Sequence, residues 1–263
     1  MGLMIGTGPF GQRSTGVFNA DLAAPAHLLY FEPSPKRVRV ELGGETIADS
    51  EGMRLLHESR LTPVYYFPES DVRRDLLVPT DHATRCPVKG QASYWSVVVG
   101  GRRAENAAWG YPEPLPSAPW LAGYVAFDWG AMDAWYEEDE QVFVHPRDPY
   151  TRIDVLRGSR KVRVRVDGTV VAETSRPSLL FETGLPARYY LPSEDVRTDL
   201  LESSDTVTRC PYKGAASYWS VRSGDGLVRD AVWSYPEPFH DAEPVAGMFC
   251  FYDERVDLEV SGL

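Results

Sequence analysis

The stretch Thr84-Arg85-Cys86-Pro87-Val88-Lys89-Gly90, which continues into Ala92-Ser93-Tyr94-Trp95-Ser96-Val97, decides the organisation of the chain. It returns as Thr208-Arg209-Cys210-Pro211-Tyr212-Lys213-Gly214, followed by Ala216-Ser217-Tyr218-Trp219-Ser220-Val221. Each matched residue and its counterpart, called here its mate, are separated by 124 positions, so no insertion or deletion lies between them. The chain is therefore a tandem duplication.

The duplication divides the 263 residues into three parts. Residues 1–27 are rich in Gly, Ala and Pro, have no mate and are predicted to form an N-terminal arm. Residues 28–150 form the first repeat with an acidic connecting segment, and residues 151–263 form the second repeat. Each repeat is long enough to bury its own core without a disulfide or a metal. We expect the repeats to pack as a pseudo-twofold pair, the covalent equivalent of a symmetric dimer, which is compatible with a monomeric chain.

The pattern of each repeat predicts a mainly β domain. Residues 37–42 alternate charged and apolar side chains before Gly43-Gly44, and residues 161–166 do the same before Asp167-Gly168, as in β-hairpins. Many further short strands with Gly and Pro turns follow, and no long amphipathic helix is present. Residues 53–61 and their mates are the exception, because their apolar runs suggest one or two helical turns.

Composition restricts the class of partner. The formal net charge is −11, from 38 acidic and 27 basic side chains, which argues against nucleic acid or an anionic membrane as partner. A small anionic ligand held by a local Arg and Lys cluster is compatible with this charge. The three cysteines, Cys86, Cys210 and Cys250, form no disulfide framework, so we expect a reduced, cytoplasmic setting. The sequence has no basic start followed by an apolar run and no apolar stretch of about 20 residues, so we expect neither export nor membrane spanning.

Cys86 and Lys89, with their mates Cys210 and Lys213, are the strongest candidates for catalysis. A lysine ammonium beside a thiol favours the nucleophilic thiolate, and the proline between them indicates a turn in which the two side chains can converge. The alternative is a small buried cysteine with a lysine that is solvated or bonded to carbonyl groups. No histidine is repeated with the motif, which excludes a shared Cys-His pair.

Further residues of the repeated segments are candidates for ligand binding. Four arginines can hold a carboxylate or phosphate, or form salt bridges with neighbouring aspartates instead: Arg73, Arg85, Arg197 and Arg209. Six aromatic residues can line a pocket wall or belong to the core: Tyr94, Trp95, Trp109, Tyr218, Trp219 and Trp233. Glu113 and Glu237, each between two prolines, are candidate acids or bases, or are simply exposed.

The combined pattern resembles a known family. The residues that carry the resemblance are Asp71-Val72-Arg73-x-Asp75-Leu76-Leu77, the Cys-Pro-x-Lys stretch and Trp109-Gly110-Tyr111-Pro112-Glu113-Pro114, with their mates. Together they resemble the domain of unknown function family numbered 427, over both repeats. The resemblance implies a small β-tent-like domain, a scaffold also found in zinc-dependent relatives, and the family's label as a predicted nucleotidyltransferase implies nucleotide chemistry.

Two absences qualify what the resemblance implies. The chain contains no Cys-x-x-Cys pair, so we expect a tent-like domain without structural zinc and without other metal ligands. It also lacks a Gly-Ser motif followed by paired aspartates, which typical transferases of that kind use to hold magnesium. The sequence identifies no cofactor. Three function classes remain: a module that binds a small anionic or nucleotide-like ligand near the Cys-Pro-x-Lys turns, an enzyme using the Cys/Lys or Glu side chains, and an interaction protein without a pocket.

Overall fold

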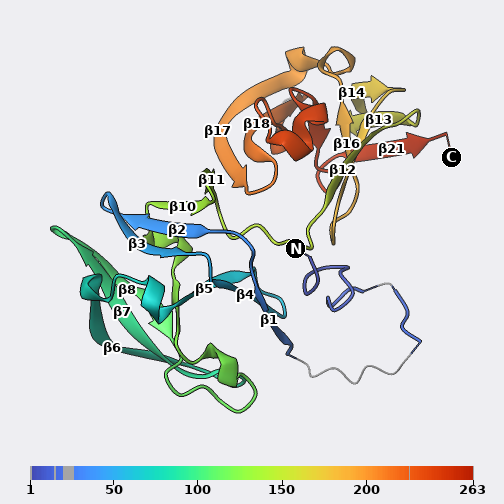
Figure 1. The fold of residues 1–263 in the computed structure, drawn as a ribbon. Coiled ribbons are helices and arrows are strands. Elements are labelled where there is room, and N and C mark those ends of the chain that lie inside the picture. Colours follow the sequence, from blue (N-terminus) through green and yellow to red (C-terminus); the bar gives the residue numbers. More distant parts are fainter. Residues whose placement is uncertain (1, 15, 20–26, 225, 263) are drawn as a thin grey trace. The chain divides into compact units, whose positions relative to one another are not determined.

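The structure is a computed structural model that describes residues 2–14, 16–19, 27–224 and 226–262. It separates into two units, Leu3–Asp148 and Pro149–Leu263, which divide beside the boundary of the sequence repeat. Each unit is mainly β and contains one large and one small antiparallel sheet (Figure 1). The part of the chain that the structure describes contains no helix that could span a membrane.

The first unit contains a seven-stranded and a four-stranded sheet. The large sheet runs, in spatial order, through β1 (Leu29–Pro33), β4 (Arg54–Glu58), β5 (Val64–Pro68), β9 (Tyr124–Phe127), β8 (Arg102–Gly110), β7 (Gly90–Val99) and β6 (Leu77–Cys86). The small sheet runs through β11 (Glu140–Val142), β10 (Ala134–Glu137), β2 (Val38–Leu42) and β3 (Glu45–Ser50). Short 3₁₀ turns connect the strands: η1 (Glu69–Asp71), η2 (Arg74–Leu76), η3 (Pro119–Leu121) and η4 (Trp129–Ala131).

The second unit repeats the strand order of the seven-stranded sheet, whereas its small sheet has three strands instead of four. Its large sheet runs through β12 (Ile153–Arg157), β15 (Ser178–Glu182), β16 (Arg188–Leu191), β20 (Phe249–Phe251), β19 (Gly226–Ser234), β18 (Gly214–Ser223) and β17 (Leu201–Cys210). Its small sheet runs through β14 (Thr169–Thr174), β13 (Lys161–Val166) and β21 (Asp257–Ser261). Its 3₁₀ turns are η5 (Ser193–Asp195), η6 (Thr198–Leu200) and η7 (His240–Val245). The expected mainly β fold in two tandem domains is confirmed.

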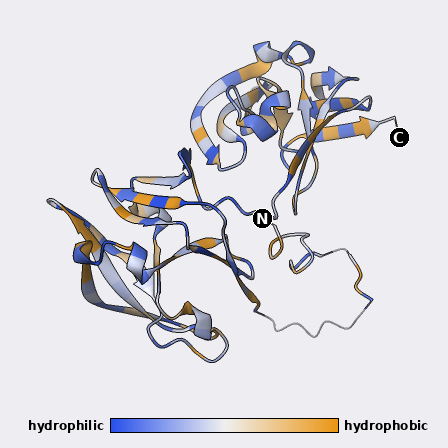
Figure 2. Ribbon diagram, in the orientation of Figure 1, coloured by the Kyte–Doolittle hydropathy of each residue, from blue (hydrophilic) through white to orange (hydrophobic). Residues whose placement is uncertain are grey.

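The alternating residues 37–42 and the glycine turn after them form the predicted hairpin, β2 and β3. Val38, Val40 and Leu42 are fully buried on one face of β2, and Figure 2 shows the alternation of hydrophobic and hydrophilic residues along this strand. Gly43 and Gly44 both have positive φ, +61° and +81°, as the tight turn to β3 requires.

The seven-stranded sheet of the first unit carries an apolar cluster on each face. One, the main core, includes Leu55, Tyr65 and residues of the four-stranded sheet. The other includes Leu56 and Tyr66. Because successive side chains of a strand point to opposite faces, the neighbouring residues Leu55 and Leu56 belong to different clusters. The face opposite the main core is called the tyrosine face, after Tyr66, Tyr94 and Tyr111, and the second unit has an equivalent face with Tyr190, Tyr218 and Tyr235.

The helical turns predicted at residues 53–61 and their mates are wrong, because these segments form β4 and β15. Each strand is buried on both faces of its sheet, so its apolar residues are consecutive instead of alternating. A short run of this kind does not distinguish a two-sided strand from a helical turn.

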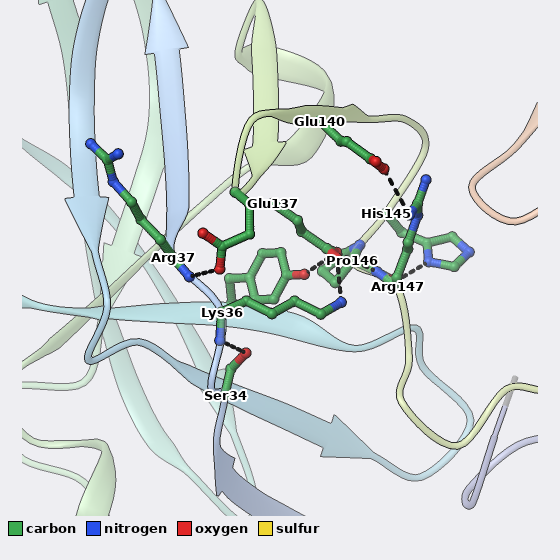
Figure 3. A network of polar contacts seen from close by, with 10 residues as sticks. Ser34, Lys36, Arg37, Glu137, Glu140, His145, Pro146 and Arg147 are labelled. Carbon is green, nitrogen blue, oxygen red and sulfur yellow. Dashed lines mark hydrogen bonds and ion pairs between the residues drawn. The ribbon is translucent and has the colours of Figure 1, made fainter.

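The acidic connecting segment at the end of residues 28–150 is only partly exposed to solvent. Glu138, Asp139 and Glu140 are exposed, but Glu137 is buried in β10. Figure 3 shows that Glu137 accepts hydrogen bonds from Lys36 Nζ and from the backbone N of Arg147, the latter at 3.2 Å. Its carboxylate therefore fastens the segment after β11 onto the first unit.

Candidate functional site

A buried ion pair lies on the tyrosine face of each unit. Lys89 Nζ donates to Glu58 Oε2 at 2.5 Å, and the two residues are only 9% and 6% exposed. Their mates Lys213 and Glu182 form the same bond and are 8% and 7% exposed. Burial removes the hydration of both charges, and the charge-assisted hydrogen bond compensates for that loss. The ammonium group of Lys89 therefore binds a carboxylate. The sequence interpretations instead placed it beside the thiol, or in solvent or on carbonyl groups.

The turn that carries Lys89 is fixed by the loop that follows β8. Leu115 N donates to Lys89 O at 3.0 Å, and Ser117 Oγ donates to Val88 O at 2.6 Å. Gly90 has a φ of +108°, and a Cβ on it would lie 3.3 Å from the backbone O of Glu113. In the second unit Phe239 N donates to Lys213 O at 3.1 Å in the same way. The close approach of the Tyr-Pro-Glu-Pro loop and the positive φ therefore both favour glycine at position 90, directly after Lys89.

Tyrosine hydroxyl groups surround the ion pair. Trp109 Nε1 donates to Tyr66 OH at 3.3 Å, and Trp233 Nε1 donates to Tyr190 OH at 3.1 Å. Burial raises the pKa of Tyr66 and that of Tyr190 far above the ordinary value, and the nearby Glu58 and Glu182 add to the effect.

Tyr111 links the ion pair to the cysteine. Burial raises its pKa first, and the proximity of Cys86 and Glu58 raises it further. Its ring also lies 5.6 Å from Lys89 Nζ. In the second unit burial and the proximity of Cys210 raise the pKa of Tyr235. The hydroxyl groups beside the pair are consequently protonated at neutral pH and can donate hydrogen bonds.

The rim of the tyrosine face is formed by β6 and β7. Thr84 Oγ1 and Tyr94 OH lie 2.9 Å apart, as do Thr208 Oγ1 and Tyr218 OH. His82 contacts the Tyr94 ring edge to face, with centroids 4.5 Å apart. Cys86 is half-buried and pairs with Gly90 across the two strands, as Thr84 pairs with Ala92, so both lie on this face. Hydroxyl, imidazole and thiol groups therefore follow one edge of the sheet.

A β-bulge places Trp109 on the same face. Asn106 has a φ of +51° and its mate Asp230 a φ of +47°. The side chain of Asn106 accepts a hydrogen bond from Thr80 Oγ1 at 2.7 Å, and its backbone N donates to Ser96 Oγ at 3.2 Å. Such a bulge shifts the phase of a strand, so Ala107 and Ala108 both contact the main core, whereas Trp109 faces the tyrosines.

The structure brings together some of the residues that the sequence singled out. The residues that meet on the tyrosine faces are Cys86, Lys89, Tyr94 and Trp109 with Cys210, Lys213, Tyr218 and Trp233. Cys86 lies near Tyr111, and Lys89 bonds Glu58. Each repeat therefore has one cluster in which aromatic rings, a thiol and a buried ion pair are neighbours.

Other candidates lie elsewhere. Trp95 and Trp219 contact the main cores, on the opposite face of the sheet. Arg85 and Arg209 precede the cysteines in β6 and β17, so strand alternation directs them away from the tyrosine faces. Arg85 is exposed and makes no ion pair with a described residue.

The remaining candidates are on the surface. Arg73 Nε and a second guanidinium nitrogen donate to both carboxylate oxygens of Asp75, at 2.8 and 2.7 Å. Arg197 holds Asp199 in the same manner, at 2.8 and 2.6 Å. These are the salt bridges that the sequence offered as the alternative to anion binding. Glu113 and Glu237 have exposed side chains, which agrees with the plainer of their two interpretations.

Sequence reasoning did not select three members of each cluster as site residues. They are Glu58, Tyr66 and Tyr111, with their mates Glu182, Tyr190 and Tyr235. A signal was present, because a glutamate returns 124 positions later at the end of an otherwise apolar run. A repeated carboxylate in such a run requires a buried partner.

Open depressions lie away from these clusters. One of about 340 Å³ is lined by residues of β3 and of the η1 region, including Asp49, Asp71 and Arg73. Another of about 310 Å³ occupies the equivalent region of the second unit, beside Glu173, Arg176 and Asp195. In the described part of the chain, no three His, Cys, Asp or Glu side chains are grouped so that they could hold a metal ion. The zinc of tent-like relatives therefore has no ligand set among these residues.

A family model described as "Domain of unknown function (DUF427)", with the short name NTP_transf_9, matches residues 30–138 and again residues 154–262. The chain belongs to the DUF427 family. The two matches correspond to the two structural units, so the protein is a tandem pair of DUF427 domains. No curated protein matches the chain.

The two DUF427 domains differ around the shared ion pair. In the first domain His27 Nε2 lies 2.7 Å from Glu58 Oε1, so this carboxylate contacts both an imidazole and an ammonium. The mate of His27 is Thr151, and the mate of His82 is Thr206. Both imidazoles are thus specific to the first domain.

Proposed function

We propose that the DUF427 domain binds a small molecule on its tyrosine face, beside the Cys-Pro-x-Lys turn. The observation that carries the proposal is the gathering of hydroxyl, thiol and charged groups on one face of the sheet, at equivalent positions of both domains. Apolar residues of similar volume would stabilise a sheet face at least as well as a buried ion pair. Buried polar groups with shifted pKa values, gathered beside a half-exposed rim, are typical of functional sites.

The charges on this face define what the ligand can be. The charge of Lys89 is matched by that of Glu58, so the pair adds no net charge that could hold an anion. The side chains left for a polar ligand are those of the rim, in particular His82, Thr84 and Tyr94. An anionic or nucleotide-like ligand would place its acceptor groups there. The net charge of −11 supports a small ligand over nucleic acid or an anionic membrane.

Binding is better supported than cysteine catalysis. A thiolate at Cys86 would need a neighbouring cation, and Lys89 donates to Glu58 instead. Tyr111, whose hydroxyl lies near Cys86, is itself protonated at neutral pH. The thiol is therefore proposed to contact the ligand and not to attack it.

The test is a thermal-shift screen with nucleoside monophosphates, nucleoside diphosphates, hydroxybenzoates and citrate. A compound that binds the native protein raises its Tm by mass action. Thr84→Val and Tyr94→Phe each remove one hydroxyl of the rim pair and should weaken binding of that compound by about tenfold, equivalent to ~1.4 kcal/mol. Arg73→Ala, in the segment between η1 and η2 and outside the tyrosine-face cluster, is the control and should leave affinity unchanged. A screen without any stabilising compound, or equal affinities in all four proteins, would overturn the proposal.

A further inference from the structure

The tyrosine faces of the two domains differ in what covers them. In the second domain the ring of Tyr252 lies on Trp233, with centroids 4.4 Å apart and planes inclined by 47°. The guanidinium of Arg188 lies 5.7 Å from the Trp233 centroid and 5.8 Å from that of Tyr252. Arg188 also donates to Glu254 Oε1 at 2.9 Å and pairs with Asp253, which fixes its position beside the rings.

Tyr252 also reaches the rim of the same face. Burial, together with the nearby hydroxyl of Tyr218, raises the pKa of Tyr252 to about 12. As a result, Trp233 and Tyr218 are only 7% and 8% exposed. The phenol of Tyr252 thus packs against the tryptophan ring and lies near the rim hydroxyl of Tyr218, in the place that a bound ligand would take.

The first domain has the same platform without this cover. Its residues at the positions of Tyr252 and Arg188 are Asp128 and Val64. Asp128 is exposed, and its Oδ1 accepts from Ala131 N at 3.0 Å, so this side chain caps η4. Trp109 and Tyr94 are accordingly half-buried, with their ring centroids 6.4 Å apart.

We infer that the first domain takes up a ligand with a planar aromatic ring that carries a hydrogen-bonding substituent, in the place that the second domain fills with its own Tyr252. The second face is then closed to that ligand. Aromatic rings pack favourably on tryptophan at the separation that Tyr252 shows. The inference rests on the proposed function and adds the ligand's class and the domain that binds it.

The experiment follows the indole N–H signals of Trp109 and Trp233 by NMR, assigned with Trp109→Phe and Trp233→Phe. The probe is 4-hydroxybenzoate, and trans-4-hydroxycyclohexanecarboxylate is the matched control, with the same charge and hydroxyl group and no aromatic ring. We expect 4-hydroxybenzoate to shift the Trp109 signal to saturation and to leave Trp233 in place. The control compound should bind at least tenfold more weakly.

Exchanging the residues at positions 252 and 128 tests whether Tyr252 is what closes the second tyrosine face. Tyr252→Asp should allow the probe to shift the Trp233 signal, and Asp128→Tyr should abolish the shift of Trp109. If either variant fails to fold, the titration of the wild-type protein still decides. Equal shifts of both indoles in the wild-type protein would show that the second face is open and would overturn the inference.

Failure of this inference can be distinguished from failure of the proposed function. Equal binding of the control compound would overturn the aromatic class and leave the proposed function intact. The aromatic class would also be overturned, with the proposed function intact, by a second result. In that result 4-hydroxybenzoate shifts neither indole signal, while a screened compound without a ring stabilises the protein and loses affinity in the Thr84 and Tyr94 variants. If no compound stabilises the protein, the proposed function itself fails.

Discussion

At the scale of single residues, the ion pair between Lys89 and Glu58 determines what the cluster can do. The sequence places Lys89 near Cys86, but the structure places its ammonium on a carboxylate from β4, which lies 31 positions earlier in the chain. A lysine so engaged provides no free cation for a thiolate. The pair instead adds two buried charges to the tyrosine face, and these charges cancel each other.

Removing the lysine of the ion pair should lower stability more in the second domain than in the first. We expect Lys213→Met to lower the free energy of unfolding by ~3–5 kcal/mol, because Glu182 remains buried without its ion-pair partner. Lys89→Met is the matched variant and should cost less, because Glu58 keeps His27. Urea unfolding of both proteins makes the comparison.

A double variant provides the control for the ion pair. Glu182→Leu combined with Lys213→Met replaces both charges by apolar groups and should recover most of the stability lost in the single variant. A double variant as unstable as Lys213→Met would show that the charge left behind is not the cause.

The buried tyrosines predict how stability depends on alkaline pH. The pKa of Tyr66 and of Tyr190 is raised in the folded protein, so folding favours the protonated hydroxyl. That contribution is fully present below the pKa of an unfolded tyrosine, about 10, and is lost as the pH rises above it. Tm should fall between about pH 9.5 and 11, and Tyr66→Phe with Tyr190→Phe should make the decline shallower. An unchanged decline would contradict the assignment.

At the scale of elements, the loop after β8 and the turn after β6 depend on each other. Gly90 is the contact point, because its positive φ and the 3.3 Å that would separate a Cβ from the Glu113 carbonyl oxygen both disfavour a side chain there. The bulge at Asn106 then directs Trp109 to the same face. Two local irregularities therefore build the cluster on an otherwise regular sheet.

A substitution at Gly90 measures this dependence. Gly90→Ala should destabilise the first domain by more than about 1 kcal/mol, since it combines an unfavourable φ with a close backbone contact. Gly101→Ala is the control, because a Cβ there has no neighbour within 4 Å, and it should be close to neutral. Similar unfolding midpoints in urea for the two variants would contradict this account.

Local sequence predicted most of the elements, and the exceptions have a physical reason. The hairpins followed from alternation and glycine turns, which are properties of neighbouring residues. The strand β4 did not, because its consecutive leucines are explained only by two apolar clusters on opposite faces of one sheet. Glu58 could not be paired with Lys89 until β4 was known to lie in that sheet.

The members of the candidate site were predicted in part for the same reason. Cys86, Lys89, Tyr94 and Trp109 were expected together and lie together. Arg85 was expected with them, but β6 continues as a strand to Cys86, so adjacent residues face opposite sides. No strand was predicted for the residues that lead to Cys86, and strand alternation would have separated Arg85 from Cys86.

At the scale of the whole molecule, the duplication has produced two domains that keep one cluster and differ in its cover. Each domain contains its own main core and its own tyrosine face. Their packing as a pseudo-twofold pair stays a prediction. The second domain carries Tyr252 and Arg188 where the first has Asp128 and Val64, so the two domains differ in the side chains beside Trp233 and Trp109.

Because each domain buries its own core, each should fold alone. We expect residues 27–150 and residues 149–263, expressed separately, to give dispersed NMR spectra and cooperative thermal unfolding. The full-length protein is the reference for both fragments. A fragment without cooperative unfolding would show that the domains depend on each other for stability.

The most direct test of the central claim is a crystal structure of the full chain with a compound that the thermal-shift screen selects. The account predicts that this compound lies on the tyrosine face, in contact with Thr84, Tyr94 and Trp109. A compound bound instead in the depression beside Asp49, Asp71 and Arg73 would contradict it.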